Sequence, residues 1–149
     1  MIRKAKEQDL KQLSRMYKSV FKVHNIFTKS EKEIEEYLKP LISDTIVAEE
    51  DGKIVGGLVI FRKQYGDWNL FNFKHVGVAN EYQGKGIGSQ LLKEAEKICK
   101  KGKVELRVAE GVSEIGTIAF YEKNGYKKEG ELESHYRKGA KCFVMGKVL

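Results

Sequence analysis

Residues 76–92 are Val76-Gly77-Val78-Ala79-Asn80-Glu81-Tyr82-Gln83-Gly84-Lys85-Gly86-Ile87-Gly88-Ser89-Gln90-Leu91-Leu92. This stretch predicts the end of a strand, a loop with a glycine at every second position, and the first turn of a helix. Glycine lacks a Cβ and reaches backbone torsions closed to other residues, so such a loop can wrap an anion with its own N–H groups. The free amides at the N-terminus of the helix point back at the loop. The stretch therefore predicts a site for a phosphate or pyrophosphate.

The residues after the loop favour an amphipathic helix. Apolar side chains recur there at the spacing i, i+1, i+4, i+7 and i+8, namely Leu91, Leu92, Ala95, Ile98 and Cys99.

The spacing excludes two common phosphate-binding motifs. Walker A requires Lys and then Ser or Thr after its last glycine, whereas Ser89 follows Gly88 here. The dinucleotide fingerprint G-x-G-x-x-G does not fit, because Gly84, Gly86 and Gly88 are evenly spaced. A plain glycine-rich turn is the structural alternative, but one glycine suffices for a turn. We therefore favour a loop shaped for an anion.

Composition predicts a single domain over residues 1–149. The chain is 41% hydrophobic and contains seven phenylalanines and seven tyrosines, which can supply a core for a chain of 149 residues. No apolar run approaches the roughly 20 residues that span a bilayer. Cys99 and Cys142 are widely separated and no signal peptide is recognised, so we expect reduced, buried thiols in a cytoplasmic protein.

Charge and histidine spacing argue against two further classes of function. The net charge is +7, but lysines are interleaved with glutamates throughout, which is typical of an ion-paired surface. No nucleic-acid-binding motif is recognisable, so we expect no nucleic acid as a partner. The histidines at positions 24, 75 and 135 lack the paired spacing of a zinc site, so we expect no metal.

The remaining segments predict a mixed α/β order of elements. Apolar spacing predicts a helix over residues 10–21, and Ser30 with Glu33 forms a capping box for a second helix that Pro40 ends or bends. A further helix is expected over residues 115–124, where Gly125 stops it. Strands are expected over residues 1–4, 44–49, 53–61, 68–78, 104–108, 126–131 and 142–148, with Asp51-Gly52 as a hairpin turn.

Two motifs in this order resemble the GNAT N-acetyltransferase superfamily. Gln83-Gly84-Lys85-Gly86-Ile87-Gly88 fits the signature Q/R-x-x-G-x-G/A of that family. Downstream, Ile118-Ala119-Phe120-Tyr121-Glu122-Lys123-Asn124-Gly125-Tyr126 is similar to its second motif, an apolar-Tyr-Glu-Lys-x-Gly-aromatic run. The element order is also similar, so the likeness covers nearly the whole chain. The final hairpin resembles that of ribosomal-protein and protein N-terminal acetyltransferases.

The resemblance implies both a fold and a coenzyme. The fold is a mixed α/β sheet of about seven strands with four helices, in which the fourth and fifth strands splay apart. The coenzyme is acetyl coenzyme A, whose pantetheine arm would be bound by the backbone of Val76, Gly77 and Val78. Its pyrophosphate would be held by the signature segment, which consists of Gln83, Gly84, Lys85, Gly86, Ile87, Gly88 and Ser89.

Acyl transfer to an amine requires a base, an oxyanion donor and an acid. The resemblance implies that Tyr121 contacts the coenzyme sulfur and acts as the acid, and a backbone N–H near Val78 is the natural oxyanion donor. Glu105 is the first candidate for the base, since related N-terminal acetyltransferases carry a glutamate on this strand; pairing with Lys103 or Arg107 is its structural alternative. His75 is the second candidate, although it is expected to pack beside Phe71 and Phe73.

The sequence determines the acetyl donor better than the acetyl acceptor. Many relatives carry an asparagine seven residues before the tyrosine, whereas this chain has Glu114 after a lengthened loop. The coenzyme contact of that asparagine is therefore expected to be lost or moved. Protein N-terminal α-amines, small amines such as polyamines, amino acids or aminoglycosides, and lysine side chains all remain open as acceptors. A coenzyme-binding sensor without efficient catalysis is the non-enzymatic alternative. The chain is expected to be a monomer or a homodimer.

Overall fold

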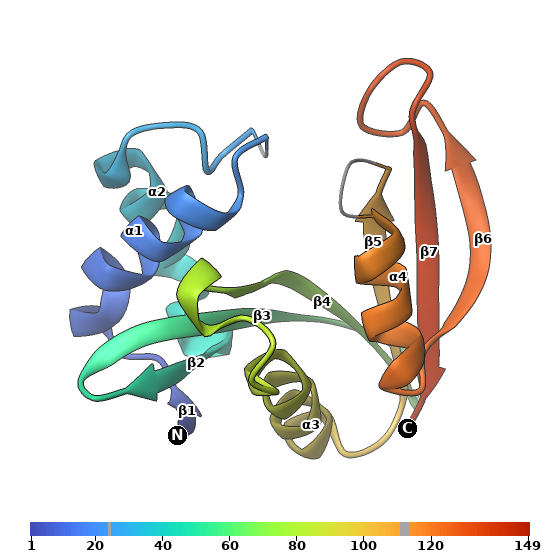
Figure 1. The fold of residues 1–149 in the computed structure, drawn as a ribbon. Coiled ribbons are helices and arrows are strands. Elements are labelled where there is room, and N and C mark those ends of the chain that lie inside the picture. The colour runs from blue at the N-terminus through green and yellow to red at the C-terminus, as the bar shows by residue number, and fades with distance from the viewer. Residues whose placement is uncertain (24, 111–113) are drawn as a thin grey trace. The chain divides into compact units, whose positions relative to one another are not determined.

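The computed structural model describes residues 1–23, 25–110 and 114–149, and for residues 114–116 it describes the backbone only. The described residues form a mixed α/β fold with one seven-stranded sheet in the order β1-β2-β3-β4-β5-β7-β6 (Figure 1). The elements are β1 (Ile2–Lys4), α1 (Leu10–Val20), α2 (Glu31–Leu38), β2 (Thr45–Glu50), β3 (Lys53–Tyr65), β4 (Trp68–Val78), α3 (Ile87–Cys99), β5 (Lys103–Ala109), α4 (Glu114–Lys123), β6 (Lys127–Glu133) and β7 (Lys141–Val148). The predicted fold class is confirmed.

The chain forms two compact units, which are described separately. Unit 1 contains residues Met1–Ile60 and His75–Ile98, and unit 2 contains residues Phe61–Lys74 and Cys99–Leu149. The single domain over residues 1–149 and the splayed fourth and fifth strands stay predictions.

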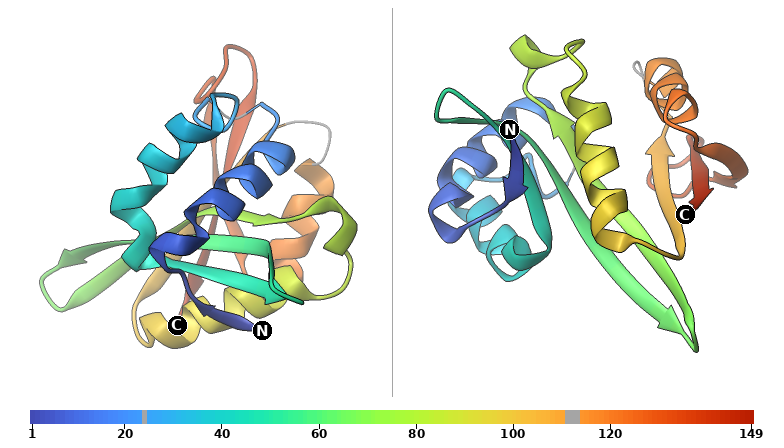
Figure 2. Two further views of the ribbon diagram at one scale, coloured as in Figure 1. Left: turned by 90° about the vertical axis from the view of Figure 1, so that its left-hand side faces the viewer. Right: turned by 90° about the horizontal axis from the view of Figure 1, so that it is seen from below.

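Helices cover both faces of the strands of unit 1, with α1 and α2 on one side and α3 on the other (Figure 2). Two consecutive glycines in β3 show how closely these helices pack against the strand. A Cβ added to Gly56 would lie 3.1 Å from Cδ1 of Leu91 on α3, and one added to Gly57 would lie 2.7 Å from the hydroxyl of Tyr17 on α1. Successive strand residues point to opposite faces, so these two positions let both helices approach the sheet.

Local sequence signals determine the ends of several elements in unit 1. Ser30 caps α2 by accepting a hydrogen bond from the Glu33 amide at 3.2 Å, and a 3-10 turn (Lys39–Asp44) begins at the residue before Pro40. Asp51 and Gly52 have φ angles of 50° and 78°, as a type I′ hairpin turn requires. These predictions are confirmed.

The third strand is longer than predicted, because β3 continues from Phe61 to Tyr65. This added segment is mostly polar and exposed, so no buried face marks it as strand in the sequence. Pairing with β4, its neighbour in the sheet, extends it. Tertiary pairing thus overrides a weak local pattern.

Unit 2 is built on the strands β5, β7 and β6. Val104, Leu106 and Val108 alternate along β5 as buried residues, which is the period of a strand with one covered face. Leu70–Asn72 of β4 pair in parallel with Lys103–Glu105 of β5, while β7 pairs with both β5 and β6 in antiparallel fashion. The helix α4 packs beside β5 and β6 (Figure 1).

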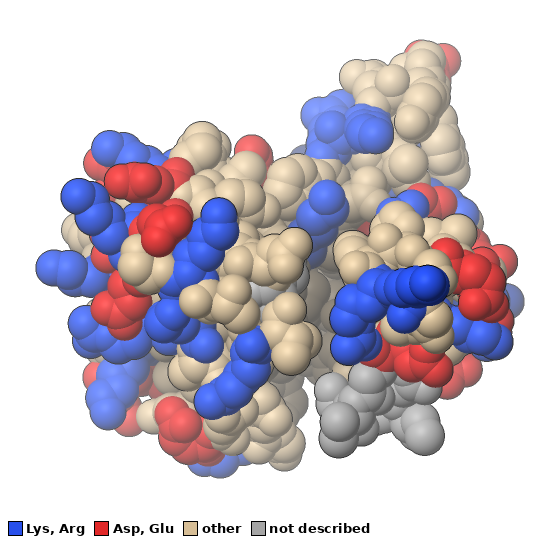
Figure 3. Space-filling model, turned by 90° about the horizontal axis from the view of Figure 1, so that it is seen from above, with Lys and Arg blue, Asp and Glu red and all other residues tan. Residues whose placement is uncertain are grey.

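The surface carries charges of both signs close together. On the face in Figure 3, Lys and Arg side chains are interspersed with Asp and Glu. Cys99 and Cys142 are both buried, and neither is in a disulfide, as predicted. Among the described residues, no helix is long and apolar enough to cross a membrane.

An ion-pair network joins β1 to the start of α1 and to β2. The guanidinium of Arg3 contacts both carboxylate oxygens of Asp9 at 2.8 and 2.9 Å, and its Nε donates to Glu49 at 2.7 Å. Asp9 also accepts a hydrogen bond from the backbone of Lys6 at 2.7 Å and is buried. The hydrogen bonds from Arg3 lower the pKa of the Asp9 carboxyl group below its usual value.

We predict that Asp9→Asn lowers the free energy of unfolding by about 2 kcal/mol at pH 7, since it breaks a largely buried charge-assisted pair. A carboxylate whose folded pKa is depressed stabilises the protein above its unfolded pKa of about 3.9 and loses that contribution as the pH falls. Urea unfolding should therefore show the deficit of Asp9→Asn shrinking below about pH 4. Asp67→Asn, at an exposed turn, is the control; a deficit that stayed constant down to low pH would contradict the assignment.

Candidate functional site

The glycine loop connects the end of β4 to the start of α3, and all of it belongs to unit 1. Gly84 and Gly86 have φ angles of +77° and +84°, a region that disfavours residues with a Cβ. The third glycine of the motif, Gly88, lies inside the first turn of α3. Buried Ile87, between the last two glycines, anchors the beginning of the helix.

The loop requires glycine for its torsion angles, not because the surroundings are crowded. A Cβ added to Gly84 or Gly86 would meet no described atom within 4 Å. The space beside these two residues is therefore open on the side where a Cβ would stand. A ligand can approach the main chain there without meeting a side chain.

Donor groups gather at the beginning of α3. The first hydrogen bond of the helix runs from the amide of Gln90 to the carbonyl of Gly86 at 3.0 Å, so the amides of residues 87–89 come before the first helical donor. The ammonium of Lys85 lies 5.1 Å from the ring centroid of Tyr82. Free amides, the positive end of the helix dipole and a nearby lysine suit a phosphate group.

Gln83 makes contacts that the sequence did not predict. Its side-chain amide donates to the carbonyl of Val78 at 2.9 Å and lies 3.3 Å from Oδ1 of Asn80. It therefore links the glycine loop to the last residue of β4.

The end of β4 packs tightly against α1. A Cβ added to Gly77 would lie 3.0 Å from Cζ of Phe21, so only glycine fits without movement of that ring. Val76 and Val78, on either side, are half-buried. The unusual torsion in this strand is at His75, whose φ is 57°.

His75 is packed in an aromatic cluster of unit 1, which consists of Tyr17, Phe21, Phe27, Tyr37 and His75. The hydroxyl of Tyr17 donates to the His75 carbonyl at 2.6 Å, and the hydroxyl of Tyr37 lies 2.8 Å from Nε2 of His75. The Phe27 ring meets the imidazole edge to face, with centroids 4.9 Å apart. These contacts give His75 a structural role, and its predicted neighbours Phe71 and Phe73 belong to the other unit.

Tyr121 is a buried residue of α4 in unit 2. Its ring packs edge to face against Phe120 and Tyr126, with centroid distances of 5.1 and 5.9 Å. Burial raises the pKa of the Tyr121 phenol well above its usual value near 10. The hydroxyl therefore keeps its proton at neutral pH.

Glu105 lies in an ion-pair network on β5. Lys103 contacts its carboxylate at 3.1 Å and the carboxylate of Glu129 at 2.6 Å. A register shift between Lys128 and Gly130 displaces Glu129, and its side chain occupies the position that a Cβ on Gly146 would need. The hydrogen bonds to Glu129 and Glu105 raise the pKa of Lys103, so it stays charged.

The other residues named in the sequence analysis lie around the segment between β5 and α4 or, for His24, between α1 and α2. Residues 111–113 and the side chain of Glu114 lie outside the described residues, and so does His24. Glu110 is described: its carboxylate accepts from the backbone of Lys141 at 2.6 Å, and its carbonyl accepts from Arg137. The end of β5 is thus tied to the last hairpin of unit 2.

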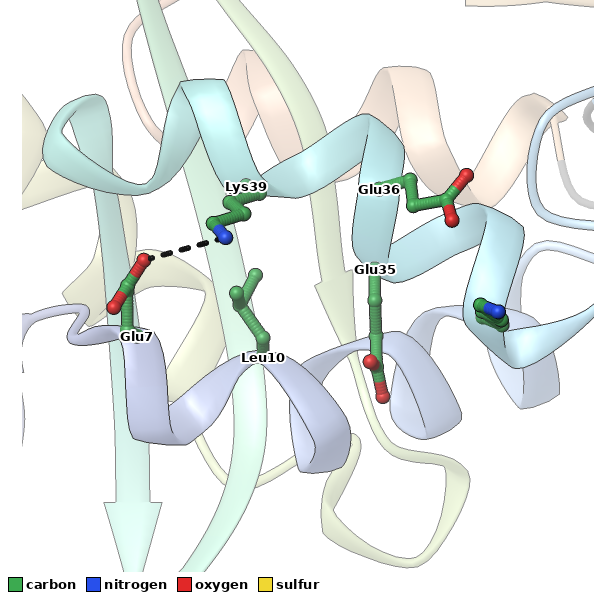
Figure 4. A pocket seen from close by; sticks show the side chains of 6 residues that line it. Glu7, Leu10, Glu35, Glu36 and Lys39 are labelled. Carbon is green, nitrogen blue, oxygen red and sulfur yellow. Dashed lines mark ion pairs between the residues drawn. The ribbon is translucent and has the colours of Figure 1, made fainter.

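Two other features offer little for catalysis. Among the described residues, no group of three His, Cys, Asp or Glu side chains could hold a metal ion. A hollow between α1 and α2 contains the ion pair of Glu7 and Lys39 at 3.9 Å (Figure 4). Its other lining residues are Leu10, Lys32, Glu35 and Glu36. None belongs to the motifs, so the glycine loop remains the principal candidate site.

Comparisons with known structures support this fold. Arabidopsis thaliana Naa50, in complex with the bisubstrate analogue CoA-Ac-MVNAL, is 22% identical, and the match covers 100% of this chain and 98% of that protein, with a TM-score of 0.80. The ribosomal-protein-alanine N-acetyltransferase of Brucella melitensis is 20% identical and covers 100% and 99%, with a TM-score of 0.77. An aminoglycoside 6′-N-acetyltransferase complexed with coenzyme A is 18% identical and covers 99% and 96%, with a TM-score of 0.77. At these identities the similarity concerns the fold.

A family model gives the more specific result. No curated protein sequence matches the chain significantly. Residues 42–128, more than half of the chain, match the acetyltransferase (GNAT) domain. The matched range contains β4, the glycine loop, α3, β5 and Tyr121. The chain therefore belongs to the GNAT family of acetyltransferases and is an acyltransferase.

Proposed function

We propose that the protein transfers the acetyl group of acetyl coenzyme A to a primary amine, and that this amine is the N-terminal α-amine of a protein. The observation that carries the proposal is the glycine loop, which presents free amides at the N-terminus of α3 directly after β4. Two structurally similar proteins were solved with coenzyme A or a coenzyme A analogue, which supports the choice of donor. The two free, buried cysteines suit a cytoplasmic location.

In the proposed donor site, each part of unit 1 has its own role. The amides of Gly84 to Ser89 hold the pyrophosphate, and Lys85 adds a positive charge. The backbone of Val76, Gly77 and Val78 binds the pantetheine arm. The N–H near Val78 is directed at the oxygen of the thioester, where negative charge develops during attack.

The proposed reaction is a direct attack of the amine on the thioester carbon. A base removes a proton from the acceptor ammonium, the new N–C bond forms, and the C–S bond breaks as the tetrahedral oxyanion collapses. The departing thiolate takes up a proton from Tyr121, and the second proton, which the attacking nitrogen loses as the amide forms, restores the phenol of Tyr121. An α-amine, with a pKa near 8, needs less help from the base than a lysine side chain with a pKa near 10.4.

Charge supports a protein α-amine over polycationic acceptors. The net charge of +7 disfavours binding of polyamines and aminoglycosides, which carry several positive charges. The aromatic cluster beside the end of β4 is composed of three half-buried residues (Phe21, Tyr37 and His75) and two buried ones. None of the five carries a carboxylate that could bind a second ammonium group. Such a cluster suits an apolar side chain next to the reacting amine.

The test is acetyl transfer from isotopically labelled acetyl coenzyme A to a panel of acceptors, followed by mass spectrometry. Peptides with a free N-terminus should gain the label, whereas N-terminally blocked peptides with an internal lysine should not. Labelling confined to spermidine or an aminoglycoside would overturn the proposed acceptor. Tight binding of the coenzyme without turnover of any acceptor would instead indicate a sensor.

We predict that Tyr121→Phe lowers kcat by about tenfold to a thousandfold and leaves KM for the acceptor nearly unchanged, because the acid acts only when the thiolate leaves. Since burial raises the pKa of this phenol, its ionisation should not appear in the pH profile of the wild type below about pH 10. Steady-state kinetics at saturating substrate measure the effect. Tyr126→Phe, a change in the neighbouring buried ring, is the matched control, and equal rates for the two variants would refute the role of Tyr121.

We propose Glu105 as the general base, and its ion-pair network supplies a matched control. Glu105→Gln should lower kcat/KM about tenfold or more, because an amide cannot take up the proton of the acceptor ammonium. Glu129→Gln also removes one carboxylate from Lys103, but it should leave kcat/KM within about twofold of the wild type. The same change in both variants would show that Glu105 serves only as an ion-pair partner.

A further inference from the structure

The side-chain amide of Gln83 has already committed its donors within the protein. An amide nitrogen carries two hydrogens, and here it lies 2.9 Å from the Val78 carbonyl and 3.3 Å from Oδ1 of Asn80. The carbonyl of Val78 can only accept, so this contact fixes which end of the amide is the nitrogen. The other end, Oε1, is an acceptor and cannot bind the oxygens of a phosphate.

The same contact holds the last peptide group of β4 from both sides. Gln83 binds its carbonyl oxygen, on Val78, and its N–H group, on Ala79, donates to the carbonyl of Val55 in β3 at 2.8 Å. A short turn follows, closed by a hydrogen bond from the Tyr82 amide to the Ala79 carbonyl at 2.9 Å. The chain that enters the glycine loop is therefore fixed to the sheet immediately before Gly84.

From these contacts we infer that Gln83 is a positioning residue, which fixes the end of β4 relative to the glycine loop and does not bind the phosphates of the donor. The inference rests on the proposed function, in which the N–H near Val78 stabilises the oxyanion. Gln83 then acts on acyl transfer through the orientation of Val78. Loss of Gln83 would therefore alter the stabilisation of the oxyanion at the thioester, whereas loss of a phosphate ligand would weaken binding only at the remote end of the coenzyme.

A donor that lacks phosphates separates the two roles. S-acetylpantetheine keeps the thioester and the arm but has no pyrophosphate. Gln83→Met, which has a similar shape but no donor, should lower kcat/KM by the same factor with acetyl coenzyme A and with S-acetylpantetheine, about tenfold to a hundredfold. Lys85→Met is the comparison variant, because losing a charge near the pyrophosphate should reduce the preference for acetyl coenzyme A over the truncated donor.

A second variant and a second measurement do not depend on turnover. Gln83→Asn keeps the amide but is too short for both contacts, and it should behave like Gln83→Met. Amide hydrogen exchange across residues 79–89 should become faster in both variants, while exchange in α1 stays at the wild-type rate.

The outcomes distinguish failure of the inference from failure of the proposed function. A loss of activity with acetyl coenzyme A alone would make Gln83 a phosphate ligand and overturn the inference. Unchanged exchange over residues 79–89 would also overturn it, since the contact would then hold nothing in place. If the wild type acetylates no amine with either donor, the proposed function fails, and hydrogen exchange still decides whether Gln83 fixes the loop.

Discussion

Close packing on both faces of β3 is the constraint on which the candidate site depends. Gly56 and Gly57 lack side chains, so Leu91 of α3 and Tyr17 of α1 approach the same strand from opposite sides. The position of Leu91 determines where α3 begins and hence where its free amides lie. Tyr17 lies closer still to the strand, and its hydroxyl donates a hydrogen bond to the carbonyl of His75. Two missing side chains thus help to place both the candidate anion site and the end of β4.

The two units differ in which groups carry their polar chemistry and in whether those groups are charged. In unit 1 the donors of the proposed coenzyme site are backbone amides and one lysine, a set that can bind an anion without the cost of burying an ionised side chain. In unit 2 Tyr121 is kept neutral by burial, while the charges of Lys103, Glu105 and Glu129 compensate one another at the surface. A neutral buried acid and paired surface charges are compatible with a stable fold, because neither leaves an isolated charge in the interior.

Much of the fold could be predicted because its signals are local. The cap at Ser30, the turn at Asp51-Gly52 and the strand from Trp68 to Val78 each follow from a few adjacent residues. The extension of β3 to Tyr65 could not be predicted, since it depends on pairing and not on a buried face. The pairing of Glu105 with Lys103 was among the expectations from the sequence and is confirmed, but other partners of the site residues could not be predicted. Glu129 reaches Lys103 through a bulge, and no periodicity indicates that the Gln83 amide turns back to Val78.

The open space beside Gly84 and Gly86 has a consequence for how such a sequence can drift. A side chain at either position would disturb no packed neighbour and would cost only the backbone strain of a left-handed residue, about 1–2 kcal/mol. Selection for folding alone would therefore tolerate the loss of either glycine, whereas Gly57 would be retained in any descendant with this core. A descendant that keeps Gly57 but replaces Gly84 and Gly86 would belong to a lineage that has kept the fold and lost ligand binding at the glycine loop.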